Sequence, residues 1–142
     1  MATLNPYLNF NGNTEEAFNF YKSVFGGEFA MLQRFKDVPQ AGDTPEGEKE
    51  KIMHIALPVG KVNMLMGTDT PESMGQLTFG NNLSLSLSTE SEEETNKIFN
   101  ALAAGGNITM PLDKMFWGAY FGMLTDKFGI HWMVNYDYDQ QK

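Results

Sequence analysis

A strand followed by an amphipathic helix is predicted twice along the chain, and each helix ends at a pair of glycines. Tyr7–Phe10 is a short extended run before a turn, and the helix after it ends at Gly26-Gly27. In the second instance, Leu83–Ser88 alternates leucine with serine, as a half-buried strand does, and its helix ends at Gly105-Gly106. The chain is therefore expected to consist of two similar halves.

The starts of the two predicted helices carry the same kind of capping signal. Asn13 can cap the first helix with Glu16 three residues on, and Ser91 with Glu94 forms the same pattern in the second. Placing Asn13 on Ser91 also superimposes apolar positions of the two helices. The acidic run around Ser91 is explained by the positive helix end and by solvation, so it is not interpreted as a cation site.

Three more strands are predicted after each Gly-Gly pair, so each half has the order β-α-β-β-β. This order predicts an α+β fold in a single domain, with a first module over about 1–67, a linker over about 68–82 and a second module over about 83–142. The segment Asp37–Lys51 mixes Pro, Gly and charged residues and is expected to be an exposed loop. The predicted strands are Phe29–Phe35, Ile52–Leu57, Val62–Met66, Ile108–Met110, Trp117–Thr125 and Ile130–Tyr136.

Composition limits the classes of function. The chain has 142 residues, of which 42% are hydrophobic, enough for one domain with a sizeable core. A formal net charge of −8 would repel a phosphate backbone, so we expect no nucleic-acid partner. No apolar run is long enough for a membrane span and the first residues lack a signal-peptide pattern, which favours a cytoplasmic protein. The absence of cysteine excludes disulfides, thiolate nucleophiles and Cys-based metal sites.

Three sequence blocks carry a resemblance to a known family. They are the helix ending FYKSVFGGE at 20–28, the block FWGAYFG at 116–122, and TDKFG at 125–129 followed by Trp132. Together with the duplicated β-α-β-β-β order, these blocks resemble the PhnB-like branch of the vicinal oxygen chelate superfamily. That superfamily includes glyoxalases, bleomycin resistance proteins and extradiol dioxygenases.

The resemblance implies a fold and a kind of chemistry. The fold would be a half-open barrel of two curved sheets with the helices packed outside, and the protein would be a homodimer, in some members with exchanged modules. In the enzymes of the superfamily, His and Glu residues hold a divalent metal that acts as a Lewis acid. Relatives in this branch also carry a demethylubiquinone methyltransferase label, but nothing in this sequence resembles a Rossmann cofactor-binding unit.

The residues at the family's metal-binding positions do not match that chemistry. An alignment anchored on the helix starts and on the hairpin glycines replaces the histidines and carboxylates by Pro6, Ser84, Met64 and Met133. A shift of one residue recovers only Asn5 and Asn63, which are weak oxygen donors. We therefore expect no metal and no cofactor at the usual site.

Other side chains are candidates for contact with a small-molecule ligand. His54 is expected on the strand face opposite Ile55 and Leu57, where either solvent or a cavity would lie, and a structural histidine is weighed above a catalytic one. The methionines are expected to pack the core or to line an adaptable apolar cavity, in preference to binding copper. For the aromatic candidates, the alternative is an ordinary core or dimer contact. The ligand-binding candidates are Asn9, His54, Met64, Trp117, Tyr120, His131 and Met133.

These expectations favour metal-free binding or sequestration of a small molecule in an apolar cavity. The alternative is a metal-dependent lyase, isomerase or dioxygenase with a rearranged site that includes His54 or His131. A third possibility is a purely structural or protein-interaction module. The acidic net charge would suit a cationic ligand if it lay near the site.

Overall fold

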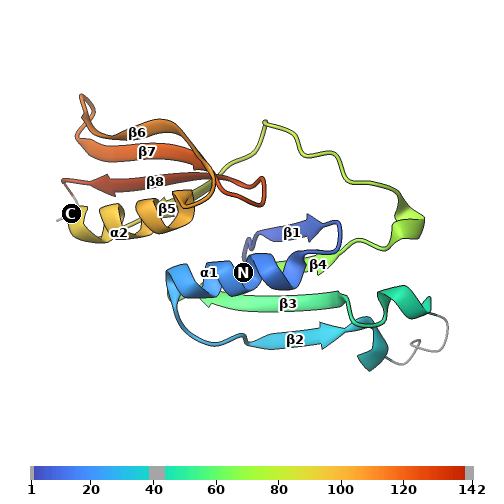
Figure 1. The fold of residues 1–142 in the computed structure, drawn as a ribbon. Coiled ribbons are helices and arrows are strands. Elements are labelled where there is room, and N and C mark those ends of the chain that lie inside the picture. The colour runs from blue at the N-terminus through green and yellow to red at the C-terminus, as the bar shows by residue number, and fades with distance from the viewer. Residues whose placement is uncertain (1, 39–43, 140–142) are drawn as a thin grey trace. The chain divides into compact units, whose positions relative to one another are not determined.

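The computed structural model of the protein describes residues 2–38 and 44–139. It divides the chain into two compact units, Met1–Thr78 and Phe79–Lys142, called here the N-unit and the C-unit (Figure 1). Part of the predicted loop over 37–51, namely residues 39–43, lies outside the described residues. In the described part of the chain, no helix is both long and apolar enough to cross a membrane.

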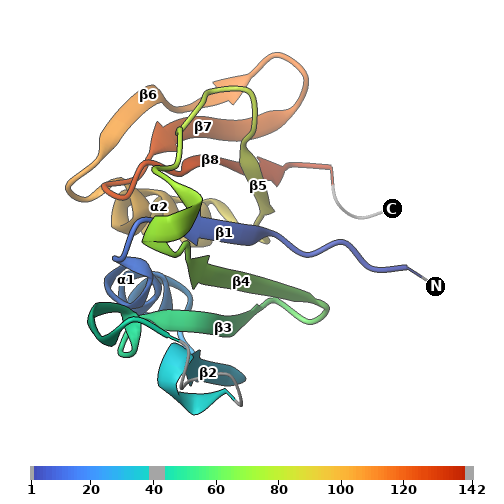
Figure 2. The same cartoon turned by 90° about the vertical axis from the view of Figure 1, so that its right-hand side faces the viewer.

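The N-unit is a mixed sheet with one helix on one face. Its strands lie in the order β1-β4-β3-β2, and only the β1–β4 pair is parallel (Figure 2). The elements are β1 (Tyr7–Phe10), α1 (Thr14–Phe25), β2 (Met31–Arg34), β3 (Ile52–Val59), β4 (Asn63–Asp69) and the 3-10 helices η1 (Phe35–Asp37), η3 (Glu46–Glu48) and η4 (Glu72–Met74).

The C-unit repeats this arrangement. Its strand order is β5-β8-β7-β6, and β5 runs parallel to β8. The predicted α+β class with two β-α-β-β-β modules is therefore confirmed. The elements are β5 (Leu85–Ser88), α2 (Glu92–Ala103), β6 (Asn107–Met115), β7 (Ala119–Thr125) and β8 (His131–Asp137).

Alternation along the strands gives each sheet a helix face, packed against the helix of its own unit, and an open face on the other side. In the N-unit, Phe18 of α1 packs edge-on against Phe10 of β1, with ring centroids 6.5 Å apart. Both side chains are fully buried, and so are Ile55 and Leu57 of β3. In the C-unit, the buried helix-face residues are Phe99, Leu102, Leu124, Trp132 and Val134. Each core is therefore built on one face of one sheet.

The two helices start differently, against the expectation from the sequence. The Ser91 hydroxyl accepts a hydrogen bond from Glu94 N at 3.0 Å, so the predicted cap of α2 is confirmed. Asn13 makes no such side-chain bond at α1, and the cap predicted there is wrong. The buried Asp69 carboxylate, at the end of β4, takes this role by accepting hydrogen bonds from Thr14 N at 3.0 Å and from the Thr14 hydroxyl at 2.6 Å.

Some element bounds also differ from the expected ones. β4 continues to Asp69, past the predicted end at Met66. β6 covers Asn107–Met115, much longer than predicted, because two register shifts let it continue through Pro111 along β7. In the loop predicted to be exposed, Glu48 is buried and its carboxylate accepts a hydrogen bond from Glu72 N at 2.8 Å.

Candidate functional site

The open face of the N-unit sheet carries methionines beside small polar groups. The strand pairing places Tyr7, Met66, Ala56 and Met31 in one row of side chains across the sheet. Beside this row, Asn9 pairs with Thr68, and His54 pairs with Gln33. Met64 lies next to the row of Met66, opposite Pro58. Three of the predicted candidates, Asn9, His54 and Met64, therefore share this face.

Tyr7 and His54 contact each other on this face. The Tyr7 hydroxyl lies 3.1 Å from Nδ1 of His54, and the two ring centroids are 5.6 Å apart. Tyr7 is on β1 and His54 is on β3, so the pair spans the intervening strand β4. Tyr7 was not among the sequence candidates, although its position two residues before Asn9 on the same strand places it on the same face.

The strand residues of this open face include no Asp, Glu, Lys or Arg. Both charged strand residues, Arg34 and Asp69, bind groups of α1 instead. Arg34 pairs with Glu15 through two N–O contacts of 3.0 and 2.8 Å. The hydrogen bonds from Arg34 lower the pKa of Glu15, and those same bonds raise the pKa of Arg34. The acidic net charge of the chain is thus not located among the strand residues of this face.

The open face of the C-unit sheet is also rich in methionine. Met133 of β8 pairs with Met123 of β7 on one side and with Ser86 of β5 on the other. Met110 of β6 lies opposite Met123, so three methionines follow one another across three strands. His131 lies on this face, two residues before Met133.

His131 uses both ring nitrogens within the C-unit. Nδ1 lies 2.8 Å from the Thr125 hydroxyl, and Nε2 lies 2.9 Å from the Gly80 carbonyl oxygen. A carbonyl can only accept, so Nε2 carries the proton and Nδ1 accepts from Thr125. His131 also borders an open hollow of about 490 Å³ with Phe79, Gly80, Asn81 and Gly129. The ring therefore reaches a solvent-accessible hollow, but neither nitrogen is available without the loss of an existing bond.

The aromatic candidates of the C-unit lie apart from each other. Trp117 is in the turn before β7, is 55% exposed, and packs against Phe121 with ring centroids 6.0 Å apart. Phe121 pairs with Asn135 on the open face, so Trp117 borders that face. Tyr120 lies on the helix face, where its hydroxyl donates to Oδ1 of Asn96 in α2 at 2.7 Å.

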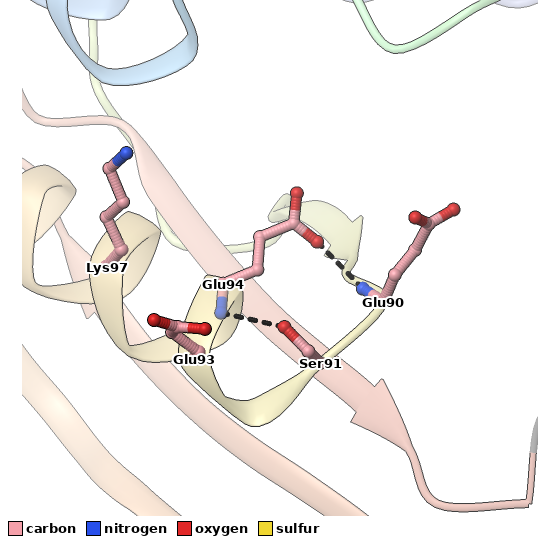
Figure 3. A pocket seen from close by; sticks show the side chains of 5 residues that line it. All are labelled: Glu90, Ser91, Glu93, Glu94 and Lys97. Carbon is pink, nitrogen blue, oxygen red and sulfur yellow. Dashed lines mark hydrogen bonds between the residues drawn. The ribbon is translucent and has the colours of Figure 1, made fainter.

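A second hollow lies at the start of α2 and is explained by helix capping. Figure 3 shows the two bonds that close this turn: Glu94 N donates to the Ser91 hydroxyl, and Glu90 N donates to Oε1 of Glu94 at 2.8 Å. Glu93 and Lys97 complete its lining. The acidic side chains satisfy the free backbone donors and the positive end of the helix.

The residues at the metal positions of the superfamily do not fit a metal. The sequence alignment places Pro6 and Met64 at these positions in the N-unit, and the pairing of Tyr7 with Met66 brings Asn5 beside Met64. Asn5 Oδ1 accepts a hydrogen bond from Met64 N at 2.9 Å. In the C-unit, the aligned residues are Ser84 and Met133, and Met133 pairs with Ser86. Neither pair offers an imidazole or a carboxylate, and within residues 2–38 and 44–139 no group of three or more His, Asp or Glu side chains could hold a metal ion.

Comparison with known proteins shows what the chain resembles. The model of the family described as 3-demethylubiquinone-9 3-methyltransferase matches residues 2–135. Protein YjdN of Escherichia coli is 31% identical over 140 residues, which cover 93% of each chain.

Solved structures give the same result for the fold. Protein PA1353 from Pseudomonas aeruginosa is 41% identical, with a TM-score of 0.83 over 96% of this chain and 98% of its own. The PhnB protein from Bacillus cereus is 29% identical, with a TM-score of 0.78 over 95% and 99% of the two chains. A glyoxalase/bleomycin resistance protein/dioxygenase family enzyme from Burkholderia phytofirmans, 17% identical with a TM-score of 0.59 over 92% and 95%, shares the fold.

Proposed function

The chain belongs to the PhnB-like family described as 3-demethylubiquinone-9 3-methyltransferase, with the glyoxalase/bleomycin resistance fold, and we propose that it binds an apolar small molecule without a metal. The observation that carries this proposal is the composition of the open faces. By the alignment that the resemblance gives, methionines stand at two of the four metal-ligand positions of the superfamily, Met64 and Met133, and further methionines lie beside them on the open faces.

The methionines of the N-unit suit a binding role. Met66 lies in the middle of its sheet, between Tyr7 of β1 and Ala56 of β3. Met31 and Met64 extend the apolar area to either side along the same face. A methionine side chain is unbranched, flexible and polarisable, so a surface made of several of them adapts to the shape of an apolar ligand.

Methyl transfer is not part of the proposal. Rossmann-type folds bind their cofactors at the carboxyl ends of a mostly parallel sheet. Here each four-stranded sheet has a single parallel pair, and the sequence contains no Gly-x-Gly-x-x-Gly motif. We propose binding or sequestration as the activity.

The proposal is tested with N-phenyl-1-naphthylamine, an uncharged fluorophore that brightens in apolar surroundings. We expect saturable binding to the wild-type protein and at least a tenfold weaker affinity in Met66→Lys, because a lysine there would place a charge in the middle of the apolar face. Val62→Lys, an exposed position in the β3–β4 turn, is the control and should bind the dye as the wild type does. Circular dichroism checks that both variants fold. Absence of saturable dye binding, or equal binding by Met66→Lys, contradicts the proposal.

A metal titration tests the metal-free part separately. Protein purified without a tag is titrated with zinc, nickel, manganese and iron(II), and bound metal is quantified after gel filtration. We expect less than one tenth of an equivalent of each. One tightly bound equivalent that is lost in His54→Ala or His131→Ala would instead support a metal-dependent enzyme with a rearranged site.

A further inference from the structure

The contact between Tyr7 and His54 indicates which hydrogen-bonding group the proposed ligand carries. We infer that His54, held by Tyr7, presents an Nε2–H donor on the open face of the N-unit to a hydrogen-bond acceptor of the ligand. The ligand is then an apolar molecule, neutral or anionic, with an exposed carbonyl, carboxylate or sulfonate oxygen. This inference rests on the proposed binding function and specifies its chemistry.

The argument starts from the hydrogen bond at Nδ1. A neutral imidazole has one N–H donor and one acceptor nitrogen, and a phenol hydroxyl can donate as well as accept. When the Tyr7 hydroxyl donates to Nδ1 across the 3.1 Å contact, the imidazole proton must lie on Nε2. Tyr7 is then a positioning residue, because it fixes the tautomer and orientation of the ring.

His54 differs from the other histidine in what Nε2 contacts. In His131, Nε2 donates to the Gly80 carbonyl. The only hydrogen bond of the His54 ring within residues 2–38 and 44–139 is the one to Tyr7, so its Nε2–H is left for solvent or a ligand. His54 is partly buried, and it pairs with Gln33 on a face whose strand residues include no carboxylate.

The absence of carboxylates among the strand residues, together with the His54 donor, favours a hydrogen-bond acceptor over a cation on this face. A cationic ligand would find no anionic partner among them, although the chain as a whole has a net charge of −8. An acceptor oxygen would find the His54 donor, and a hydrogen bond between a neutral donor and a charged acceptor is stronger than a neutral pair. This location of charge replaces the expectation that the acidic chain would suit a cation.

Nitrogen NMR of the two histidines tests the tautomer. With ¹⁵N-labelled histidine, long-range proton–nitrogen spectra show which ring nitrogen is protonated, and His131 serves as an internal reference because its Nε2 faces a carbonyl. We expect the same Nε2–H pattern for His54 at a pH where both rings are neutral. In Tyr7→Phe, the His54 signals should move toward an exchanging mixture, while those of His131 stay unchanged. An Nδ1–H pattern for His54 in the wild type would overturn the inference.

Two matched dyes test the ligand class. 8-Anilinonaphthalene-1-sulfonate adds an anionic acceptor group to the same aromatic body as N-phenyl-1-naphthylamine. In His54→Phe, which keeps a ring but no donor, we expect about a tenfold loss of affinity for the sulfonate dye, the size of one hydrogen bond to a charged group. The uncharged dye should bind within about twofold of the wild type. Tyr7→Phe should show a smaller loss in the same direction, and thermal melting confirms that both variants fold.

The outcomes separate this inference from the proposed function. If neither dye binds the wild type, the proposed binding function fails. If both dyes bind and His54→Phe weakens them equally or not at all, the face still binds apolar molecules, but the role of His54 as the donor is overturned. A loss of affinity in His54→Phe for the sulfonate dye alone supports both the binding function and the role of His54 as the donor.

Discussion

Asp69 and Asp126 are both buried, and each accepts several hydrogen bonds at the end of a strand. Asp69 receives hydrogen bonds from Thr14 on one oxygen and from Ile52 N, at 2.8 Å, on the other. One carboxylate oxygen of Asp126 accepts hydrogen bonds from Phe128 N and Ile130 N, and the other accepts one from the Trp132 indole N–H. An ionised carboxylate can satisfy several donors at once, which lets these turns close without water.

Asp69→Asn should therefore destabilise the N-unit. The amide has one acceptor oxygen, and its NH₂ group would face a backbone donor, so one buried N–H loses its partner at a cost of about 1–3 kcal/mol. Urea unfolding followed by circular dichroism measures the change. Asp37→Asn, where an exposed carboxylate accepts from Arg34 N, is the control and should change stability by less than about 1 kcal/mol. Equal effects of the two substitutions would contradict the role given to Asp69.

Tyr138 should ionise at unusually high pH. Partial desolvation, the hydrogen bond to Glu92 and the negative charge of that carboxylate raise the pKa of Tyr138 to about 12. Since an unfolded tyrosine has a pKa of about 10, the contribution of this group to stability is present below that pH and is lost as the pH rises through about 12. Ultraviolet titration of the phenolates should show one late tyrosine, and Glu92→Gln should lower its pKa. A titration unchanged by Glu92→Gln would contradict the assignment.

At the scale of elements, the two helices are held to their sheets in different ways. The first turn of α2 is closed by a side chain of its own N-cap, Ser91, whereas the first turn of α1 is closed by Asp69 from another strand. The start of α1 therefore depends on the sheet being formed.

This difference predicts that two similar substitutions change stability by unequal amounts. Ser91→Ala removes an N-cap hydrogen bond and should cost about 0.5–2 kcal/mol. Asn13→Ala removes a side chain that caps nothing and should change stability by less than about 0.5 kcal/mol. Urea unfolding of both variants provides the measurement. A larger loss in Asn13→Ala would contradict the structure at this turn.

Helix α1 packs tightly against its sheet at Gly67. A β-carbon at Gly67 would lie 2.6 Å from Cε1 of Phe18 and 3.2 Å from the carbonyl oxygen of Leu8. Gly67→Ala should destabilise the protein by about 1–3 kcal/mol, because the ring or the helix must move. Gly47→Ala, where nothing lies within 4 Å, should leave stability unchanged or raise it slightly. Thermal unfolding of the two variants, compared with that of the wild type, measures both changes in stability.

Local sequence signals predicted the elements well. The strand Tyr7–Phe10 and the helix ends expected at the glycine pairs agree with the structure. Register was harder, because it depends on contacts between strands that are distant in the sequence. The helix start does not determine which residue of the first strand lies beside Met64, and only the pairing of Tyr7 with Met66 shows that it is Asn5. β6 was underestimated for a related reason, since proline is a poor strand signal unless a bulge accommodates it.

The candidate site was predictable from the sequence where it depends on alternation along one strand, and not where it depends on contacts between distant residues. The alternation of strand residues put His54 on the face opposite Ile55 and Leu57, which are both fully buried. It could not pair His54 with Tyr7, which is 47 positions away in the sequence. Nor could it reveal that both nitrogens of His131 are engaged, since Gly80 lies 51 positions from it.

At the scale of the whole molecule, each unit has its own core. The fully buried side chains of the N-unit pack between α1 and its sheet, and those of the C-unit pack between α2 and its sheet. The helix of each unit packs on the sheet of that unit, so we expect a core to open as a local unit.

Hydrogen exchange should report this independence. In Gly67→Ala, amide exchange should accelerate in β3 and β4, while the amides of β7 and β8 keep their wild-type rates. The physical reason is that a clash with Phe18 raises the free energy of the N-unit alone. Mass spectrometry of peptides from the exchanged protein resolves the two units. Equal acceleration in both would show that they unfold as one cooperative body.

The division of each sheet into a helix face and an open face has a consequence for how such a chain can diversify. Residues of the core and residues of the open face alternate along the same strands, so Leu8 and Phe10 lie on one side while Tyr7 and Asn9 lie on the other. Substitutions at the second set leave the packing of the first untouched. New specificities can therefore accumulate on an unchanged scaffold, and a duplicated unit offers two such surfaces for independent variation.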